Sequence, residues 1–179
     1  MAGLYLGDVH MKIAYSGIEG AFANIAARRV FPDQELVPYG DFRSAYEAVE
    51  NGICDYAVLP IENSYAGEVG QVTDLMFQGS LFVNAVYTLN VIQNLLGVSG
   101  SELTNVRKVL SHPQALEQCA DFIQEHGFQT EEAVNTARAA KKVAELGDVT
   151  TAAIASEETA SLYGLEVLER GINGKQDNS

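Results

Sequence analysis

The sequence predicts an α/β fold with two lobes and a cleft between them. Short apolar runs alternate with amphipathic stretches along the chain, which favours strands alternating with helices. This alternation occurs twice, on either side of an apolar segment at residues 81–96, and 179 residues suffice for two small lobes. Because asparagines interrupt that segment, we expect it to form one or two strands leading out of the first lobe rather than a membrane span.

The first lobe is expected at residues 12–92, after an N-terminal extension or linker at residues 1–11. A helix beginning after Asp41 is indicated by apolar side chains at i, i+3, i+4 and i+7, and Gly52 ends it. The other elements expected in this lobe are strands at 12–17, 35–39 and 56–61, a polar loop at 62–64, and helices at 22–30 and 69–77.

The second lobe is expected at residues 93–164. A helix over 113–126 has an apolar face and is closed by Gly127. The other elements expected here are strands at 106–110, 130–134 and 151–155, and helices at 137–146 and 157–163. A further strand begins at residue 165, and a return of residues 165–179 to the first lobe is left open.

The charge balance excludes some classes of protein. With 24 acidic and 11 basic side chains the formal net charge is −13, and the basic residues are scattered. Nucleic-acid binding needs clustered Lys and Arg, so we exclude it. Runs of about 18 apolar residues are absent from the sequence, which argues against a membrane span. The N-terminal stretch lacks the basic region of a signal peptide, so a cytoplasmic location is expected.

The two cysteines predict no metal site. Cys54 and Cys119 form no CxxC motif, and no nearby His completes a ligand spacing. We therefore expect both to be reduced thiols that are buried as small apolar groups.

Three junctions between a strand and a helix carry small polar residues. Helix N-termini expose unpaired backbone N–H groups, so such junctions favour anion binding even in an acidic protein. The junctions are Glu62-Asn63-Ser64 with Gly67, Ser111-His112-Pro113-Gln114, and Asn135-Thr136.

Each of these junctions also has a purely structural interpretation. Ser111 and Thr136 are suitable helix N-caps, and the asparagines suit turns. His112 is either a general acid or base or a turn residue bonded to the backbone. Glu62 is either catalytic or a residue that orients its neighbours.

Two motifs at these junctions resemble the prephenate dehydratase family. Residues 58–69 read VLPIENSYAGEV, similar to the family's PIENS motif with its following glycine, and residues 111–119 read SHPQALEQC, similar to its SHPQAL motif. Residues 14–22 are similar to the family's first glycine loop, and residues 152–165 to its closing section. The resemblance spans about residues 12 to 178 in the family's order.

The resemblance implies a lyase that converts prephenate to phenylpyruvate in phenylalanine biosynthesis, on a fold similar to type II periplasmic binding proteins. Prephenate loses its ring carboxylate as carbon dioxide and its hydroxyl as water, and no metal or organic cofactor is needed. The implied catalytic residues are Asn63, Gln114 and Thr136. The implied substrate-binding residues are Ala21, Phe22, Ser64, Gly67, Ser111, His112, Asn135 and Ala137. Among them, Asn63 and Gln114 are expected to orient the substrate, and Thr136 and Ser111 to bind a carboxylate.

The sequence departs from the family's pattern at three places. Ala21 and Ala23 stand where hydroxyl residues are usual, and Asn135 replaces a common Ser. The family continues into Thr-Arg-Phe after the segment at residues 176–179, and that Thr is the usual candidate acid. We therefore expect slow turnover of prephenate by the chain as it stands.

Other functions and partners remain open. An arogenate dehydratase shares these motifs, and a non-catalytic module that binds a small carboxylate would have the same two lobes. A homodimer is expected because an exposed sheet edge tends to pair. Relatives also carry ACT or chorismate mutase domains, so a fusion to either outside this chain is expected.

Overall fold

The computed structural model describes residues 10–63 and 67–174, and they form an α/β protein. The chain divides into two compact units. The first unit comprises Met1–Gly17, Ala23–Ile61 and Val69–Tyr87, and the second comprises Ile18–Phe22, Glu62–Glu68 and Thr88–Ser179. Three short segments from within residues 12–92 thus group with the second unit: Ile18–Phe22, Glu62–Glu68 and residues 88–92.

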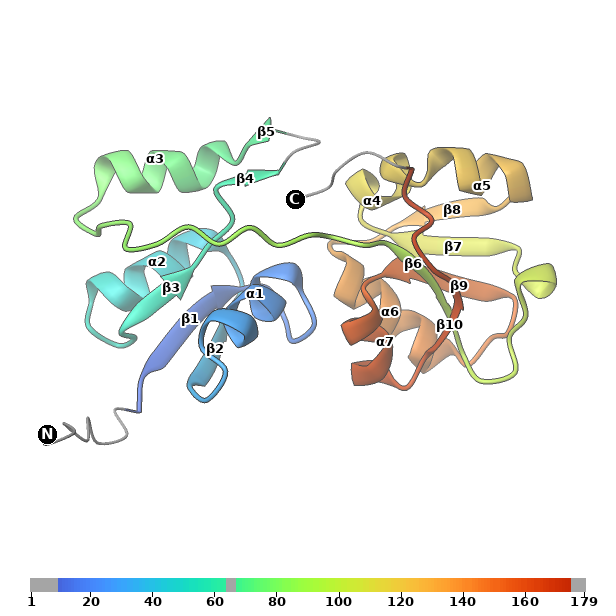
Figure 1. Ribbon diagram of the computed structural model, residues 1–179, viewed down its shortest axis with the longest axis horizontal. Helices are drawn as coiled ribbons and strands as arrows, with labels where there is room; N and C mark the ends of the chain where they lie inside the picture. The colour runs from blue at the N-terminus through green and yellow to red at the C-terminus, as the bar shows by residue number, and fades with distance from the viewer. Residues whose placement is uncertain (1–9, 64–66, 175–179) are drawn as a thin grey trace, which may run out of the picture. The chain divides into compact units, whose positions relative to one another are not determined.

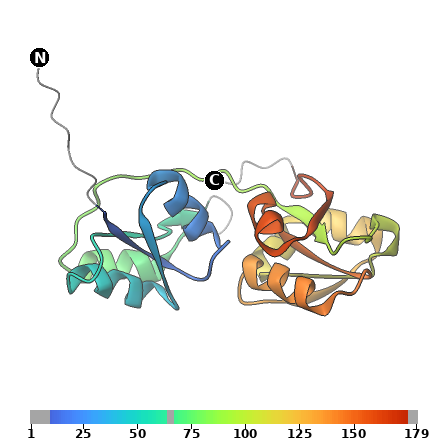
Figure 2. The same cartoon turned by 90° about the horizontal axis from the view of Figure 1, so that it is seen from below.

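The first unit has a three-stranded parallel sheet in the order β2-β1-β3. Helices α1 and α2 lie on opposite faces of this sheet (Figure 2). Ile13 and Tyr15 pack with Ala27 of α1 on one face, and Ala14 packs with Ala45 of α2 on the other, as the alternation of a strand requires. The bounds are β1 (Lys12–Ser16), α1 (Phe22–Val30), β2 (Glu35–Tyr39), α2 (Phe42–Glu50), β3 (Tyr56–Val58) and α3 (Gly70–Gln78).

The second unit has a five-stranded mixed sheet in the order β10-β6-β9-β7-β8 (Figure 1). Strands β8, β7 and β9 are parallel, whereas β6 and β10 run antiparallel to their neighbours. The strands are β6 (Asn94–Gly97), β7 (Lys108–Ser111), β8 (Gln129–Glu132), β9 (Thr151–Ala155) and β10 (Glu166–Glu169). The helices are η1 (Leu103–Asn105), α4 (Pro113–Gln118), α5 (Ala120–His126), α6 (Thr136–Leu146) and α7 (Glu157–Tyr163).

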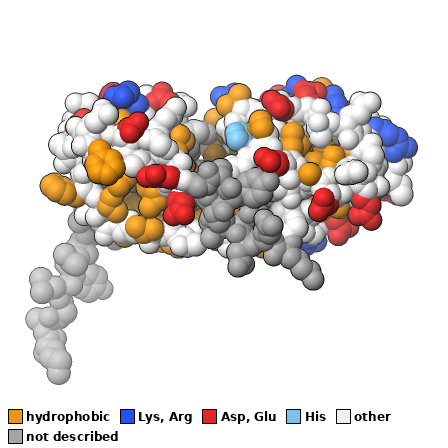
Figure 3. Space-filling model, turned by 90° about the horizontal axis from the view of Figure 1, so that it is seen from above, with side chains coloured by type: hydrophobic (Ala, Val, Ile, Leu, Met, Phe, Trp, Pro, Cys, Tyr) orange, Lys and Arg blue, Asp and Glu red, His pale blue; other side chains and the backbone are white. Residues whose placement is uncertain are grey.

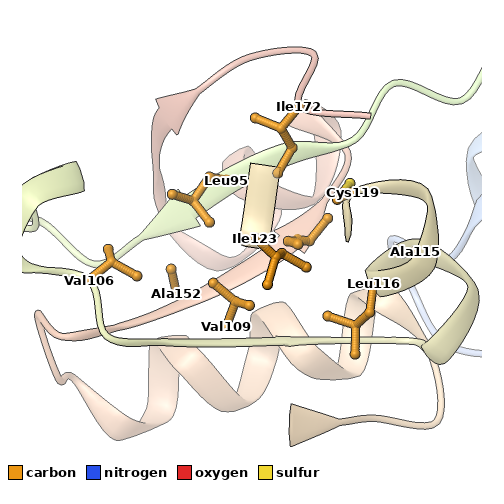
Figure 4. Close-up of a cluster of buried hydrophobic side chains, with 10 residues drawn as sticks. Leu95, Val106, Val109, Ala115, Leu116, Cys119, Ile123, Ala152 and Ile172 are labelled. Carbon is orange, nitrogen blue, oxygen red and sulfur yellow. The ribbon is translucent and has the colours of Figure 1, made fainter. Parts of the chain in front are cut away.

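Helices cover both faces of this sheet, so the central strands are buried on each side. Alternate strand residues such as Leu95 and Val109 pack under α4 and α5 with Ile123 (Figure 4). Their sequence neighbours, such as Leu96 and Leu110, pack against α6 and α7. Burial on both faces explains why these strands read as continuous apolar runs.

Several elements differ from the expected ones. Residues 81–93, expected to form one or two strands, form neither helix nor strand. Their apolar composition favours an extended chain, but a β-strand also needs a neighbouring strand to which it is hydrogen-bonded. The helix expected over 113–126 is interrupted at Cys119, which has φ −105° and ψ 14°. The expected loop after residue 61 contains a two-stranded hairpin of β4 (Glu62–Asn63) and β5 (Gly67–Glu68).

Residues 166–169 of the C-terminal segment pair with β6 in the second unit, so this strand does not return to the first sheet. Gly127 ends α5 in the left-handed conformation, as the sequence predicted, and Gly147 ends α6 in the same way. None of the helices that the described residues form is long and apolar enough to span a membrane.

Candidate functional site

The carboxyl ends of β7, β9 and β8 lie at one edge of the second unit's sheet, because these three strands are parallel neighbours. Each strand runs into a helix, and the N-caps of α4, α6 and α7 are His112, Asn135 and Ser156. All three caps accept a hydrogen bond from a backbone N–H of their helix. Ligands of open α/β sheets bind at such an edge, so it is the candidate site.

Ser111 ties the three strand ends together. Its side chain is fully buried, and its hydroxyl donates to the carbonyl oxygen of Ile154 in β9 at 2.6 Å. Its own carbonyl accepts from the N–H of Ala133, just after β8, at 2.8 Å. The sequence predicted an N-cap or a direct carboxylate contact for Ser111, whereas this geometry assigns its hydroxyl proton to the sheet.

His112 is the actual N-cap of α4. Its Nδ1 accepts from the backbone N–H of Gln114 at 3.2 Å, which places the proton of a neutral ring on Nε2. Partial burial lowers the pKa of His112 below its usual 6.5, and the negative charge of Glu132 opposes this shift. At neutral pH the ring is therefore uncharged and carries a hydrogen-bond donor at Nε2.

Gln114, in the first turn of α4, holds a buried polar atom that is left unpaired. Its Nε2 is inaccessible to water and has no hydrogen-bond partner among the described residues. Burying an amide donor without a partner costs about 1–3 kcal/mol. A ligand oxygen at this position would remove that cost, which is consistent with the substrate-orienting role predicted for Gln114.

The N-terminus of α6 favours an anion. Asn135 Oδ1 accepts from the N–H of Arg138 at 2.8 Å, and the first turn contains no acidic residue. Thr136 and Ala137 are buried there, and their backbone N–H groups have no acceptor within the helix. The cap is thus Asn135 rather than Thr136, so the Thr136 hydroxyl is not used for capping.

The loop at residues 18–22 lies beside this helix start. A Cβ built on Gly20 would be 3.6 Å from the Cβ of Ala137, so the two backbones approach closely. Ala21 is buried and its N–H donates to the carbonyl of Ile18 at 3.0 Å, while Phe22 begins α1. The loop that carries Ala21 and Phe22 therefore approaches the start of α6, where Thr136 and Ala137 lie.

The residues of α7 that contact this loop were not among the candidates that the sequence indicated. Thr159 donates to the carbonyl of Gly20 at 3.0 Å, and Tyr163 donates to that of Glu19 at 2.9 Å. Ser156 caps the same helix and bonds Thr159 at 2.8 Å. The sequence did offer one signal for these residues: Ser156 directly follows strand β9, and Thr159 comes three residues later.

The hairpin places two of the remaining candidates. Asn63 of β4 pairs with Gly67 of β5, and the segment Glu62–Glu68 groups with the second unit. Ser64 lies outside the described residues, and the substrate contacts of Asn63 and Gly67 stay predictions.

Nothing in the described parts of the chain resembles a metal centre, since no three His, Cys, Asp or Glu side chains there gather as ligands. Burial raises the pKa of the Cys119 thiol to about 12, so it stays protonated. Acidic side chains are spread over both units on the face shown in Figure 3, and the site's attraction for an anion therefore depends on local dipoles.

Comparisons with known proteins identify the family of the chain. The family model described as prephenate dehydratase matches residues 13–179. A curated relative named arogenate dehydratase/prephenate dehydratase 1, chloroplastic, from Arabidopsis thaliana, is 40% identical over 96% of this chain. The chain spans 44% of that relative's length.

Two solved structures share the fold closely. A prephenate dehydratase from Arthrobacter aurescens, in complex with L-Phe, superposes with a TM-score of 0.85 at 27% identity, covering 93% of this chain and 57% of that one. A protein titled GqqA, a novel type of quorum quenching acylases, gives 0.84 at 34% identity, covering 92% of this chain and 60% of that one. With the family model matching nearly the whole sequence, the chain belongs to the prephenate dehydratase family.

Proposed function

We propose that this chain catalyses the decarboxylating dehydration of prephenate to phenylpyruvate. The observation that carries the proposal is the neutral, anion-favouring start of α6 next to a strand end where Gln114 holds a buried unpaired donor. Neighbouring strands lie about 5 Å apart, so both features are within reach of one small dicarboxylate. The SHPQAL-like motif at residues 111–119 contains Gln114.

The proposed roles follow from the available donors. The backbone amides of Thr136 and Ala137 bind one carboxylate of the substrate, aided by the helix dipole. Gln114 Nε2 and His112 Nε2 donate hydrogen bonds that orient the rest of the substrate. Fixed donors that need no reorganisation during reaction stabilise developing charge more than water does.

Thr136 is the proposed partner of the leaving hydroxyl. As the bond between the ring and its carboxylate breaks, the electron pair moves into the ring and the C–O bond breaks. The departing oxygen then needs a proton or a strong hydrogen bond, and the buried Thr136 hydroxyl lies next to the carboxylate-binding amides.

Arogenate is the second candidate substrate. It differs from prephenate in carrying an amino group in place of the side-chain keto oxygen, and the Arabidopsis relative is named for both substrates. A non-catalytic module that binds a small carboxylate is the third candidate.

We do not propose acylase activity. The serine hydroxyls at the carboxyl ends of β7 and β9 are already used, because Ser111 donates to Ile154 and Ser156 bonds Thr159. Neither is paired with a general base, which an acyl-transfer nucleophile requires.

The test measures phenylpyruvate formation from prephenate and phenylalanine formation from arogenate. We expect product from prephenate in the wild type and a fall of about 100-fold in kcat for Thr136→Val. The control is Ser161→Ala, because that hydroxyl is exposed on α7. A raised melting temperature with both compounds and no product from either would contradict the proposal and support the binding module.

The cellular location, the oligomeric state and the fused domains of the protein stay predictions. The cytoplasmic location is untested, since the Arabidopsis relative is named chloroplastic. The homodimer is likewise a proposal, and light scattering tests it by measuring the molar mass in solution. The fusion to an ACT or chorismate mutase domain is also a proposal, and the sequence of the full gene product tests it.

A further inference from the structure

We infer that Thr159 and Tyr163 are positioning residues that hold the loop at residues 18–22 against the start of α6. The inference deepens the proposed function and rests on it, because the loop carries the substrate-binding candidates Ala21 and Phe22. Neither α7 side chain needs to touch the substrate for this role.

The two contacts come from one face of α7. Thr159 and Tyr163 are four residues apart, so their side chains project on the same side of the helix. They bond the carbonyl oxygens of successive loop residues, Gly20 at 3.0 Å and Glu19 at 2.9 Å. Two bonds to adjacent peptide groups restrict rotation as well as translation of the loop.

The hydroxyl protons of this network have a defined direction. Thr159 has one hydroxyl proton and donates it to Gly20, so its 2.8 Å bond with Ser156 must use the Ser156 proton. Ser156 in turn accepts from the N–H of Thr159 at 3.2 Å. Thr159 is fully buried and Ser156 is 5% exposed, so water does not readily replace these bonds.

The loop packs closely against α7 at Gly20. Gly20 has φ +86°, and a Cβ added there would be 3.0 Å from Leu162 Cδ2 and 3.5 Å from Thr159 Oγ1. The glycine thus brings the loop backbone directly onto α7, and Ala137 of α6 borders the same spot at 3.6 Å. The hydroxyls of α7 therefore set how the loop meets the anion-favouring helix start.

The first test measures amide hydrogen exchange in peptides covering residues 18–22, without substrate. Thr159→Val keeps the shape and removes the donor, and we expect exchange at least about five-fold faster than in the wild type. Thr159→Ser keeps the hydroxyl and is expected to exchange like the wild type, as is the control Ser161→Ala. Tyr163→Phe is the second variant and is expected to accelerate exchange about two- to five-fold.

Two results would overturn the inference. One is an amide exchange rate at residues 18–22 that equals the wild-type rate in both Thr159→Val and Tyr163→Phe. The other is equal acceleration in peptides from β7, which would indicate general destabilisation rather than release of the loop.

The second test separates the inference from the proposed function. In steady-state assays with prephenate, Thr159→Val is expected to raise KM about five-fold and to change kcat by less than about two-fold, with rescue by Thr159→Ser. An unchanged KM would contradict the role in substrate binding. A wild type that forms no phenylpyruvate would overturn the proposed function, while the exchange result would still decide whether Thr159 holds the loop.

Discussion

Helix α2 in the first unit and helix α6 in the second begin with the same geometry but different charge. In α2, Asp41 Oδ1 accepts from the N–H of Ser44 at 2.7 Å, and in α6, Asn135 Oδ1 accepts from that of Arg138 at 2.8 Å. The hydrogen bond from the Ser44 backbone lowers the pKa of Asp41, so it is an anion at neutral pH. Asn135 is neutral.

The difference shows how one capping geometry serves two purposes. The carboxylate of Asp41 supplies the negative charge that the α2 dipole favours, so this helix start offers little to a ligand. The amide of Asn135 accepts a hydrogen bond from the α6 backbone without neutralising the helix dipole, so this helix start still favours an anionic group. The first turn of α7 contains the acidic residues Glu157 and Glu158, so the start of α7 resembles that of α2 in carrying negative charge.

The largest expected effect concerns Gln114. Gln114→Glu replaces the buried unpaired donor with a carboxylate that repels a dianionic substrate, and we expect kcat/KM for prephenate to fall about 100-fold. Gln124→Glu makes the same charge change at an exposed position of α5 and is expected to stay within about two-fold. Equal losses in the two variants would show that net charge, not this position, governs binding.

A smaller effect is expected on the free energy of unfolding when one glycine of each unit is replaced by alanine. Gly20 and Gly52 both have positive φ, but a Cβ at Gly20 meets Leu162 whereas Gly52 has no atom within 4 Å of its Cβ position. Gly52→Ala is expected to lower the free energy of unfolding by about 1 kcal/mol and Gly20→Ala by about 3 kcal/mol. Urea unfolding measures both, and similar losses would mean that the Gly20 loop is not held tightly.

The smallest expected effect is the pH dependence from His112. Because its pKa is lowered in the folded protein, the unfolded chain binds the proton more readily between pH 6.5 and the folded value. The stability contribution of neutral His112 is therefore complete above pH 6.5 and is lost as the pH falls through the folded pKa. Urea midpoints of wild type and His112→Asn should converge at acidic pH, and parallel profiles would contradict this assignment.

Much of the fold was predictable because it depends on local spacing. Alternating apolar runs indicated β1, β2 and β9, and Asp41 and Gly127 marked helix ends through their own conformational preferences. The kink at Cys119 was not predictable, since hydrogen bonds from Cys119 to Ala115 and from Ile123 to Cys119 continue on both sides of it. The interruption lies in the dihedral angles of Cys119, and the spacing of apolar side chains along the sequence does not indicate such a local change.

The candidate site was predictable in part. The motif at residues 111–114 and the pair Asn135-Thr136 do lie at neighbouring strand ends, as parallel topology requires. The contact between Thr159 and Gly20 spans 139 positions of sequence, so no local pattern reports it. The hydroxyl of Ser111 could equally cap α4 or bond β9, and only the register of the sheet decides between these partners.

Two variants that exchange the caps of α2 and α6, each titrated calorimetrically with prephenate, show whether the neutral cap of α6 governs anion binding. Asn135→Asp gives α6 the carboxylate that α2 has, and Asp41→Asn gives α2 the amide that α6 has. If the neutral cap keeps α6 open to an anion, Asn135→Asp weakens binding about ten-fold and Asp41→Asn leaves it within about two-fold. Wild-type affinity in Asn135→Asp, or equal losses in both variants, would contradict the claim.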